Sequence, residues 1–238
     1  MKTNFYKKGY NKTLNYSNSY KEKKNYINYF SKNYGQFIAN KKDIRILDIG
    51  CGNGLFLEYL KGQGYNNILG IDLSQENIII CKGKGLNVLE IDVFTYLNRN
   101  KEKFDLIVMN DIIEHILRDK VILLLKLIKL NLRNKGILLI KTLNMSNPVS
   151  LDTLYCDFTH QWGYSQKSIE QICFLAGFKN VEVKNIIIYP NISFLDWIFP
   201  FIYKLIKIKY KMIFTFYGKK GNNVFSKNLL CIAKNEKI

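Results

Sequence analysis

Residues 45–54 read RILDIGCGNG, a short apolar run that leads into an aspartate and a glycine-rich turn. The apolar residues around Asp48 fit a buried β-strand, and Gly50, Gly52 and Gly54 follow at alternate positions. Glycine permits a sharp turn and lets a ligand come into van der Waals contact with the backbone. In doubly wound sheets, ligands bind where such a turn follows the carboxyl end of a strand. The stretch therefore predicts a ligand site across the turn.

Segments typical of strands and of helices alternate along the rest of the chain. We expect strands over residues 43–49, 66–73, 86–93, 103–111, 137–144, 179–189 and 223–234. We expect helical segments over residues 54–64, 74–85, 112–136 and 165–178. This alternation predicts an α/β fold, with a doubly wound, mostly parallel sheet covered by helices on both faces.

The length of the chain suits one large domain. Its 238 residues are 47% apolar and 14% aromatic, which is enough for a sizeable globular core. We expect a single domain over residues 1–238, with a tail and cover helix at 1–40. The core then spans 44–190 and 222–238, and an aromatic, basic insert occupies 191–221.

The cysteines and the N-terminal segment bear on the cellular compartment. The five cysteines are scattered without a CxxC pair, which fits reduced thiols in the cytoplasm. The first 20 residues are basic but contain no apolar core segment, so we expect no signal peptide. We predict a cytoplasmic protein without a transmembrane segment.

The formal net charge of +17 leaves several partners open. Such an excess fits nucleic acid, an anionic membrane surface or an acidic substrate. The basic residues are almost all lysines spread along the chain, however, and an A/T-biased genome produces the same abundance of Lys, Asn and Ile. We therefore do not expect nucleic acid as the partner.

The insert before the last expected strand, within residues 192–220, combines aromatic residues with lysines. Asp196 and several lysines interrupt it too often for a membrane span, which needs about 20 mostly apolar residues. Two interpretations remain. The insert is either a lid packed over the substrate site or an amphipathic helix in peripheral contact with the inner face of the membrane.

Three carboxylates follow strands at the predicted site. Asp48 precedes the glycines, where it would repel a pyrophosphate but attract an ammonium or sulfonium group. Asp72 ends the second expected strand about 20 residues after the loop, where a carboxylate binds ribose hydroxyls. Asp92 lies near the end of the third, where it can accept a hydrogen bond from an adenine amino group.

The segments ILDIGCGNG, GIDLS, EIDV, FDLIVMNDIIEHI and GILLIKTLN resemble, in order and spacing, the class I S-adenosylmethionine-dependent methyltransferases. The resemblance covers residues 44–183 and the last strand, and it implies a seven-stranded Rossmann-like sheet whose last strand is antiparallel beside the fifth. It implies S-adenosylmethionine as cofactor and S-adenosylhomocysteine as product. The implied cofactor-binding residues are Asp48, Gly50, Cys51, Gly52, Gly54, Asp72, Leu73, Asp92, Val93 and Asn110.

Both histidines of the chain fall near the expected donor methyl group. If a helix begins near Asp111, then Asp111, Glu114 and His115 share one of its faces. His160 follows the fifth expected strand and reaches the same end of the sheet. These four residues could form a general-base cluster or bind Mg²⁺ or Mn²⁺. Alternatively, Glu114 and His115 only shape the pocket floor.

Two narrower resemblances suggest different acceptors. The spacing of Asp111, Glu114, His115 and His160 resembles metal-dependent small-RNA 2′-O-methyltransferases, but departs from them at Asp111 and in the segment QWGYS. EHI together with DFTH and SIEQICFLAGF is more similar to bacterial ubiquinone-type and surface-polysaccharide O-methyltransferases. We therefore expect methyl transfer to an oxygen of a small or glycan-linked acceptor, in capsule or polysaccharide synthesis. An RNA methyltransferase and an inactive donor-binding scaffold are the alternatives.

Overall fold

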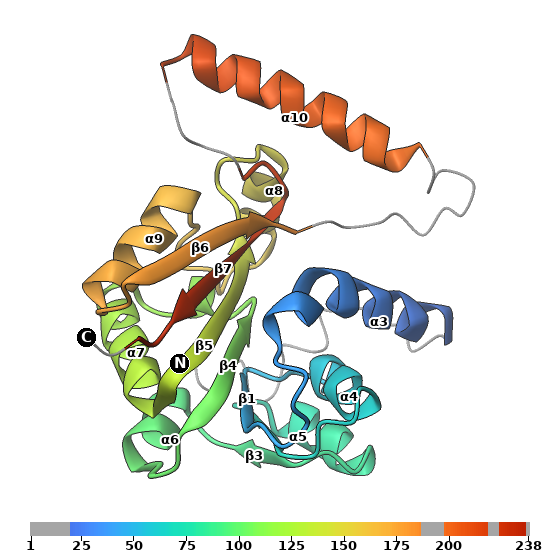
Figure 1. Ribbon diagram of the computed structural model, residues 1–238, viewed down its shortest axis with the longest axis vertical. Coiled ribbons are helices and arrows are strands. Elements are labelled where there is room, and N and C mark those ends of the chain that lie inside the picture. Colours follow the sequence, from blue (N-terminus) through green and yellow to red (C-terminus); the bar gives the residue numbers. More distant parts are fainter. Residues whose placement is uncertain (1–19, 187–197, 219–223, 237–238) are drawn as a thin grey trace.

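The computed structural model describes residues 20–186, 198–218 and 224–236, and within them forms one seven-stranded sheet with helices on both faces (Figure 1). The strands are β1 (Ile46–Ile49), β2 (Ile68–Asp72), β3 (Val88–Glu90), β4 (Phe104–Asn110), β5 (Leu132–Leu143), β6 (Asn180–Asn185) and β7 (Asn228–Lys234). The helices are α3 (Tyr20–Tyr34), α4 (Leu55–Gly62), α5 (Gln75–Gly83), α6 (Val93–Arg99), α7 (Arg118–Asn131), α8 (Val149–Cys156), α9 (Gln166–Leu175) and α10 (Phe199–Phe216). Two 3₁₀ turns are η1 (Gly35–Phe37) and η2 (Ile113–His115).

The strand order is β3-β2-β1-β4-β5-β7-β6. The first five strands are parallel, and β7 runs antiparallel between β5 and β6. The predicted doubly wound sheet is confirmed, including the last strand inserted beside the fifth. The order reverses at β1 and β4, so their carboxyl ends open the crevice in which such sheets bind ligands.

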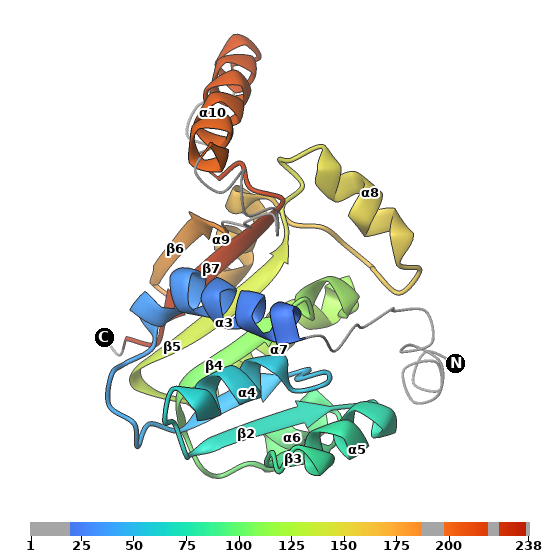
Figure 2. The ribbon, with the colours of Figure 1, turned by 90° about the vertical axis from the view of Figure 1, so that its right-hand side faces the viewer.

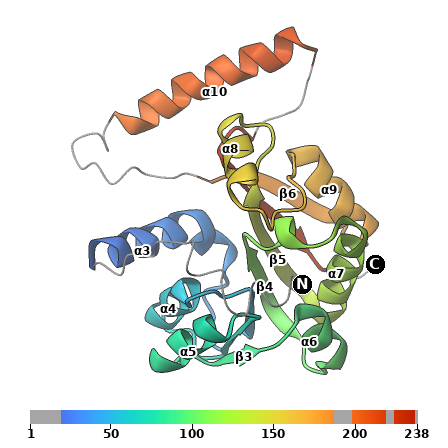
Figure 3. The ribbon, with the colours of Figure 1, turned by 180° about the vertical axis from the view of Figure 1, so that it is seen from behind.

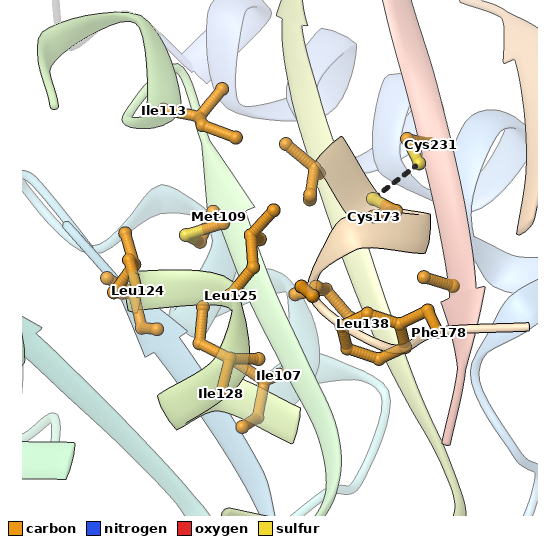
Figure 4. Packing of buried hydrophobic residues seen from close by; sticks show 14 of the residues in the cluster. Ile107, Met109, Ile113, Leu124, Leu125, Ile128, Leu138, Cys173, Phe178 and Cys231 are labelled. Carbon is orange, nitrogen blue, oxygen red and sulfur yellow. Dashed lines mark hydrogen bonds between the residues drawn. The ribbon is translucent and has the colours of Figure 1, made fainter. Parts of the chain in front are cut away.

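Each face of the sheet is covered by its own apolar cluster, which explains why the strands read as continuous apolar runs. On one face, α7 and α9 pack on the sheet; Leu124, Leu125 and Phe178 lie in this cluster (Figure 4). On the other face, α3, α4 and α5 form an aromatic cluster that includes Phe30 and Tyr34. Figure 2 shows α3 lying alongside α4, where a cover helix was expected.

The third strand is shorter than predicted. β3 ends at Glu90, so Asp92 does not end a strand but is the N-cap of α6. Its Oδ1 accepts a 3.0 Å hydrogen bond from the Thr95 backbone N–H, which satisfies one of the unpaired donors of the helix N-terminus. The sequence also gave no expectation of α6 or α8. Part of the insert lies outside the described residues, and no helix described is long and apolar enough to cross a membrane.

Candidate functional site

The carboxyl end of β1 carries a buried carboxylate. Asp48 is 2% exposed, and its Oδ1 has no hydrogen-bond partner within the described part of the chain. Burial, and then the nearby Asp72 carboxylate, hold the pKa of Asp48 well above its usual range. Burying an ionised group without a partner is costly. A cationic group beside the loop would relieve that cost, so the residue fits the ammonium of a bound methionine moiety.

The glycine loop after β1 is tied to the end of β2. The Gly50 N–H donates to the Ile71 carbonyl at 2.8 Å, and the Gly52 N–H donates to Asp72 Oδ2 at 2.9 Å. Asp72 Oδ1 accepts from the Ser74 N–H at 2.7 Å. Asp72 therefore orders the loop and the start of α5 together. Burial raises the pKa of Asp72, while these backbone donors lower it.

Alanine substitutions at Gly50 and Gly52 are expected to have different effects on folding stability and on donor binding. Both have positive φ, 69° at Gly50 and 53° at Gly52, which costs an L-residue about 1–2 kcal/mol. A Cβ at Gly50 overlaps the Ile112 side chain, whereas a Cβ at Gly52 meets no atom within 4 Å. Gly50→Ala should therefore lose a further ~1–3 kcal/mol through overpacking.

Denaturant unfolding and titration with S-adenosylhomocysteine measure the two effects. Gly52→Ala should lose only the ~1–2 kcal/mol that its positive φ costs, but it should bind S-adenosylhomocysteine at least ~10-fold more weakly, because its Cβ enters the open space over the loop. Unchanged affinity in Gly52→Ala would place the donor elsewhere.

The remaining expected cofactor residues lie at the same edge of the sheet. Asn110 ends β4, and its Oδ1 accepts a 2.6 Å hydrogen bond from the Tyr34 hydroxyl of α3. Gly54 precedes α4, Cys51 is buried within the loop, and Leu73 and Val93 are half-buried next to Asp72 and Asp92. Their contacts with a donor stay predictions.

The prediction of a helix that begins near Asp111 is wrong. Asp111 has φ of 54°, in the left-handed region, and the chain then forms the 3₁₀ turn η2 before α7 begins at Arg118. Asp111 instead forms an ion pair with Lys141 of β5. Burial opposes the charge on Lys141, but Asp111 and then Tyr29 raise the pKa of the lysine above its ordinary value. Lys141 was not among the predicted site residues. The feature that could have indicated it is that it is the one lysine inside the apolar run ILLIKTL.

Glu114 is a buried carboxyl on η2. It is 1% exposed; its Oε2 accepts from the Thr142 hydroxyl at 3.0 Å, and its carbonyl accepts from the Gln161 N–H at 2.7 Å. Burial, and then Asp111, raise the pKa of Glu114 to about 8. These contacts join η2 to β5 and to the loop after α8. The pocket-floor interpretation of this residue stays a prediction.

Glu114 is expected to make the stability pH-dependent. Its folded pKa of about 8 exceeds its ordinary value of 4.5, so between these values the folded state keeps a proton that the unfolded state has lost. The stabilisation is complete below 4.5 and is lost as the pH rises through 8, at up to about 1.4 kcal/mol per pH unit. Glu114→Gln should remove this slope, whereas Glu90→Gln on the surface should retain it. Urea unfolding across this pH range measures it, and parallel curves for wild type and Glu114→Gln would contradict the assignment.

The two histidines are brought together. The ring centroids of His115 and His160 are 4.6 Å apart. His160 Nδ1 lies 3.0 Å from the Leu154 carbonyl, which can only accept, so Nδ1 carries the proton and Nε2 the lone pair. His115 Nδ1 lies 2.8 Å from the Thr159 hydroxyl, which itself donates to Asp157 at 2.6 Å. By the same reasoning the lone pair of His115 is on Nε2.

The charge state of the pair follows from burial. Desolvation, and then the neighbouring His160, lower the pKa of His115 to about 4. His115 is therefore neutral at pH 7, and its neutral ring next to His160 avoids a repulsion between two imidazolium groups. The same low pKa makes His115 a weak base, so it is less suited than His160 to take a proton from an acceptor.

The metal-compatible group differs from the one expected. Among the described residues, His115, Asp157 and His160 each offer one ligand atom, and these atoms lie within 4.8 Å of one another. Asp111 and Glu114 do not join this group, because Asp111 pairs with Lys141 and Glu114 with Thr142. Asp157 takes the place of the carboxylates in the predicted set.

The sheet order and the glycine loop tied to a carboxylate after β2 define a class I S-adenosylmethionine-dependent methyltransferase fold. The family model described as methyltransferase domain matches residues 21–183, and the chain belongs to this family.

Two curated relatives match shorter segments. The chain is 39% identical over 79 residues to a ubiquinone biosynthesis O-methyltransferase of Pelagibacter ubique, covering 32% of each protein. It is 42% identical over 60 residues to mouse EEF1A lysine methyltransferase 2, covering 24% of this chain and 25% of that protein. The matches thus span about a third or less of the relatives' length, so they leave the acceptor open.

Solved structures show the same fold. A methyltransferase from Archaeoglobus fulgidus has a TM-score of 0.64 at 23% identity, covering 87% of this chain and 94% of that one. The N-methyltransferase NodS from Bradyrhizobium japonicum, in complex with S-adenosylhomocysteine, has a TM-score of 0.57 at 14% identity, covering 93% and 90%. At this identity the likeness is one of fold.

Proposed function

We propose that the protein transfers the methyl group of S-adenosylmethionine to an oxygen of a small or glycan-linked acceptor. The observation that carries this proposal is the pair His115 and His160, whose Nδ1 atoms are both held so that their Nε2 atoms carry the lone pairs. The matched segment of the ubiquinone O-methyltransferases supports an oxygen acceptor.

The chemistry asks two things of the protein. The donor is already activated as a sulfonium, so the chain must hold donor and acceptor in line and exclude water. A hydroxyl must also lose its proton to a base as the new bond forms. In the proposed reaction the S–CH₃ bond breaks, an O–CH₃ bond forms, and the hydroxyl proton passes to His160 Nε2.

On the donor side, the methionine moiety is held by Asp48 and the loop glycines, the ribose by Asp72, the adenine by Asp92, and Asn110 lies near the sulfur. The orphaned carboxylate oxygen of Asp48 supports the methionine assignment. Lys141 and Tyr34 support the site by fixing Asp111 and Asn110.

A sugar hydroxyl or a phosphorylated group in capsule or surface-polysaccharide synthesis is the acceptor class that the DFTH segment favours. The net charge of +17 is compatible with a phosphorylated or nucleotide-linked acceptor. RNA is the less favoured alternative, because Asp111, which that reaction would use as a metal ligand, is paired with Lys141.

Methyl-labelled S-adenosylmethionine separates these possibilities. The protein is incubated with a small-molecule extract containing nucleotide sugars, with a quinone-precursor phenol, and with total RNA, each with and without EDTA. Label in a small molecule, insensitive to EDTA, supports the proposal. Label in RNA that EDTA abolishes would overturn it and assign Mg²⁺ or Mn²⁺ to His115, Asp157 and His160.

A further inference from the structure

The helix α10 lies at the end of the molecule where we propose that the acceptor binds, which is called the acceptor end below. It lies between β6 and β7, and because β7 is antiparallel to both β5 and β6, the insert joins the sheet at the edge where β5 ends. The loop that carries His160 follows β5 through α8 at this same edge. Figures 1 and 3 show α10 outermost at this end of the molecule, and Figure 2 shows α8 to one side of it.

Within the described residues, one narrow stripe attaches α10 to the body. The Tyr203 hydroxyl donates to Asn185 Oδ1 at 3.1 Å, and the rings of Tyr210 and Phe214 lie 6.2 and 5.7 Å from that of Phe225. These three helix residues are spaced i, i+7 and i+11, so they share one face. A lid packed over the site would bury a wider face than this.

The opposite face of α10 is apolar and open to solvent. Phe201, Leu205, Ile208 and Met212 form one exposed stripe, and Met212 is 61% exposed. A second exposed stripe is made by the residues Ile202, Ile206 and Ile213. A contiguous exposed apolar face of this kind marks an interaction surface.

The charges on α10 are all positive. Lys204, Lys207 and Lys211 form a third exposed stripe, and residues 198–218 contain no aspartate or glutamate. Lys209 is exposed and occupies the i+7 position of the stripe that begins at Ile202. This combination of a broad apolar face with lysines is typical of helices that lie in a membrane interface.

We propose that α10 binds the surface of an anionic lipid bilayer. A second copy of this chain would oppose lysines to lysines, and a protein groove would bury Lys209 among apolar groups without a partner on the helix. In a bilayer interface the same lysine extends its carbon chain along the apolar surface and reaches lipid phosphates. The helix would rest in the headgroup layer with the acceptor end of the sheet toward the lipid.

The test is co-sedimentation of the full chain with vesicles of phosphatidylcholine, with or without phosphatidylglycerol. Wild type should bind the anionic vesicles. The triple variant Lys204→Glu, Lys207→Glu, Lys211→Glu should bind about 100-fold more weakly, since each lysine near an anionic surface contributes to binding. The matched control Lys101→Glu, Lys103→Glu, Lys126→Glu makes the same change in net charge on exposed residues away from α10 and should bind like wild type.

A second variant tests the apolar face. Leu205→Asp with Met212→Asp should also lose vesicle binding, while affinity for S-adenosylhomocysteine stays unchanged and shows that the fold is intact. The proposal is overturned if the control and α10 lysine variants bind equally. It is also overturned if wild type ignores the vesicles and sediments as a dimer that the double variant disperses. Neither result depends on the acceptor or on O-methylation.

Discussion

Replacing Asp72 by alanine is expected to weaken binding of S-adenosylmethionine and S-adenosylhomocysteine by about 10²–10⁴-fold. The two carboxylate oxygens offer about four lone pairs in all, and the Gly52 and Ser74 amides and the Asn77 side chain already bond some of them. Two ribose hydroxyls donating to this carboxylate are worth about 1.5–3 kcal/mol each, because the acceptor is charged. The variant also leaves the Gly52 N–H without its partner, so the loop loses its order. Isothermal titration with S-adenosylhomocysteine measures the loss.

The neighbouring strand supplies the control for Asp72. Glu90 ends β3, pairs in register with Asp72, and is exposed. Glu90→Ala should bind S-adenosylhomocysteine with a Kd within a factor of two of the wild-type value, since it removes a carboxylate from the same edge of the sheet without touching the loop. Asp72→Asn keeps one acceptor oxygen and should fall between the two. If Asp72→Ala binds S-adenosylhomocysteine within a few-fold of wild type, the ribose is not held at the end of β2.

The sheet could be predicted from the sequence because each of its strands leaves a local signal. Strands buried on both faces read as apolar runs. Ser74 indicates a helix N-cap, and Gly50 indicates a turn. The errors in the predicted strand bounds arise where contacts between residues far apart in the sequence determine where a strand begins. β5 begins at Leu132, five residues before the predicted start, and the Leu132 carbonyl there is bonded by the Asn235 side chain from beyond β7. A pairing over more than 100 residues has no local signature.

The same distinction explains the candidate site. The proposed donor-binding residues lie on one loop and at or just after strand ends, so their spacing in the sequence indicates their geometry. The residues of the proposed acceptor site meet only through the tertiary fold. Asp111 pairs with Lys141 and not with the expected cluster, and Asp157 orients His115 through Thr159. Composition identified the two histidines, but not which carboxylate would lie beside them.

Among the residues expected near the acceptor, we propose His160 as the group that takes the acceptor proton. Glu114 is buried and bonded to Thr142, and Asp111 is neutralised by Lys141. His115 has a pKa of about 4, so it is a weak base. His160 belongs to the loop after α8, and its Nδ1 proton is fixed on the Leu154 carbonyl. A base acting from this position should contribute about 10²–10⁴-fold to the rate.

His160→Ala is therefore expected to lower kcat by about 10²–10⁴-fold with unchanged affinity for S-adenosylhomocysteine. His160→Asn should lose as much, because its amide can still donate to the Leu154 carbonyl but cannot accept the proton, which separates catalysis from anchoring of the loop. Added imidazole should restore part of the activity of His160→Ala by supplying a base in the vacated space. Single-turnover methyl transfer to the acceptor found in the labelling experiment measures all three. If kcat falls less than threefold in both variants, His160 is not the base and only anchors the loop. The same conclusion follows if His160→Asn is fully active and imidazole does not rescue His160→Ala.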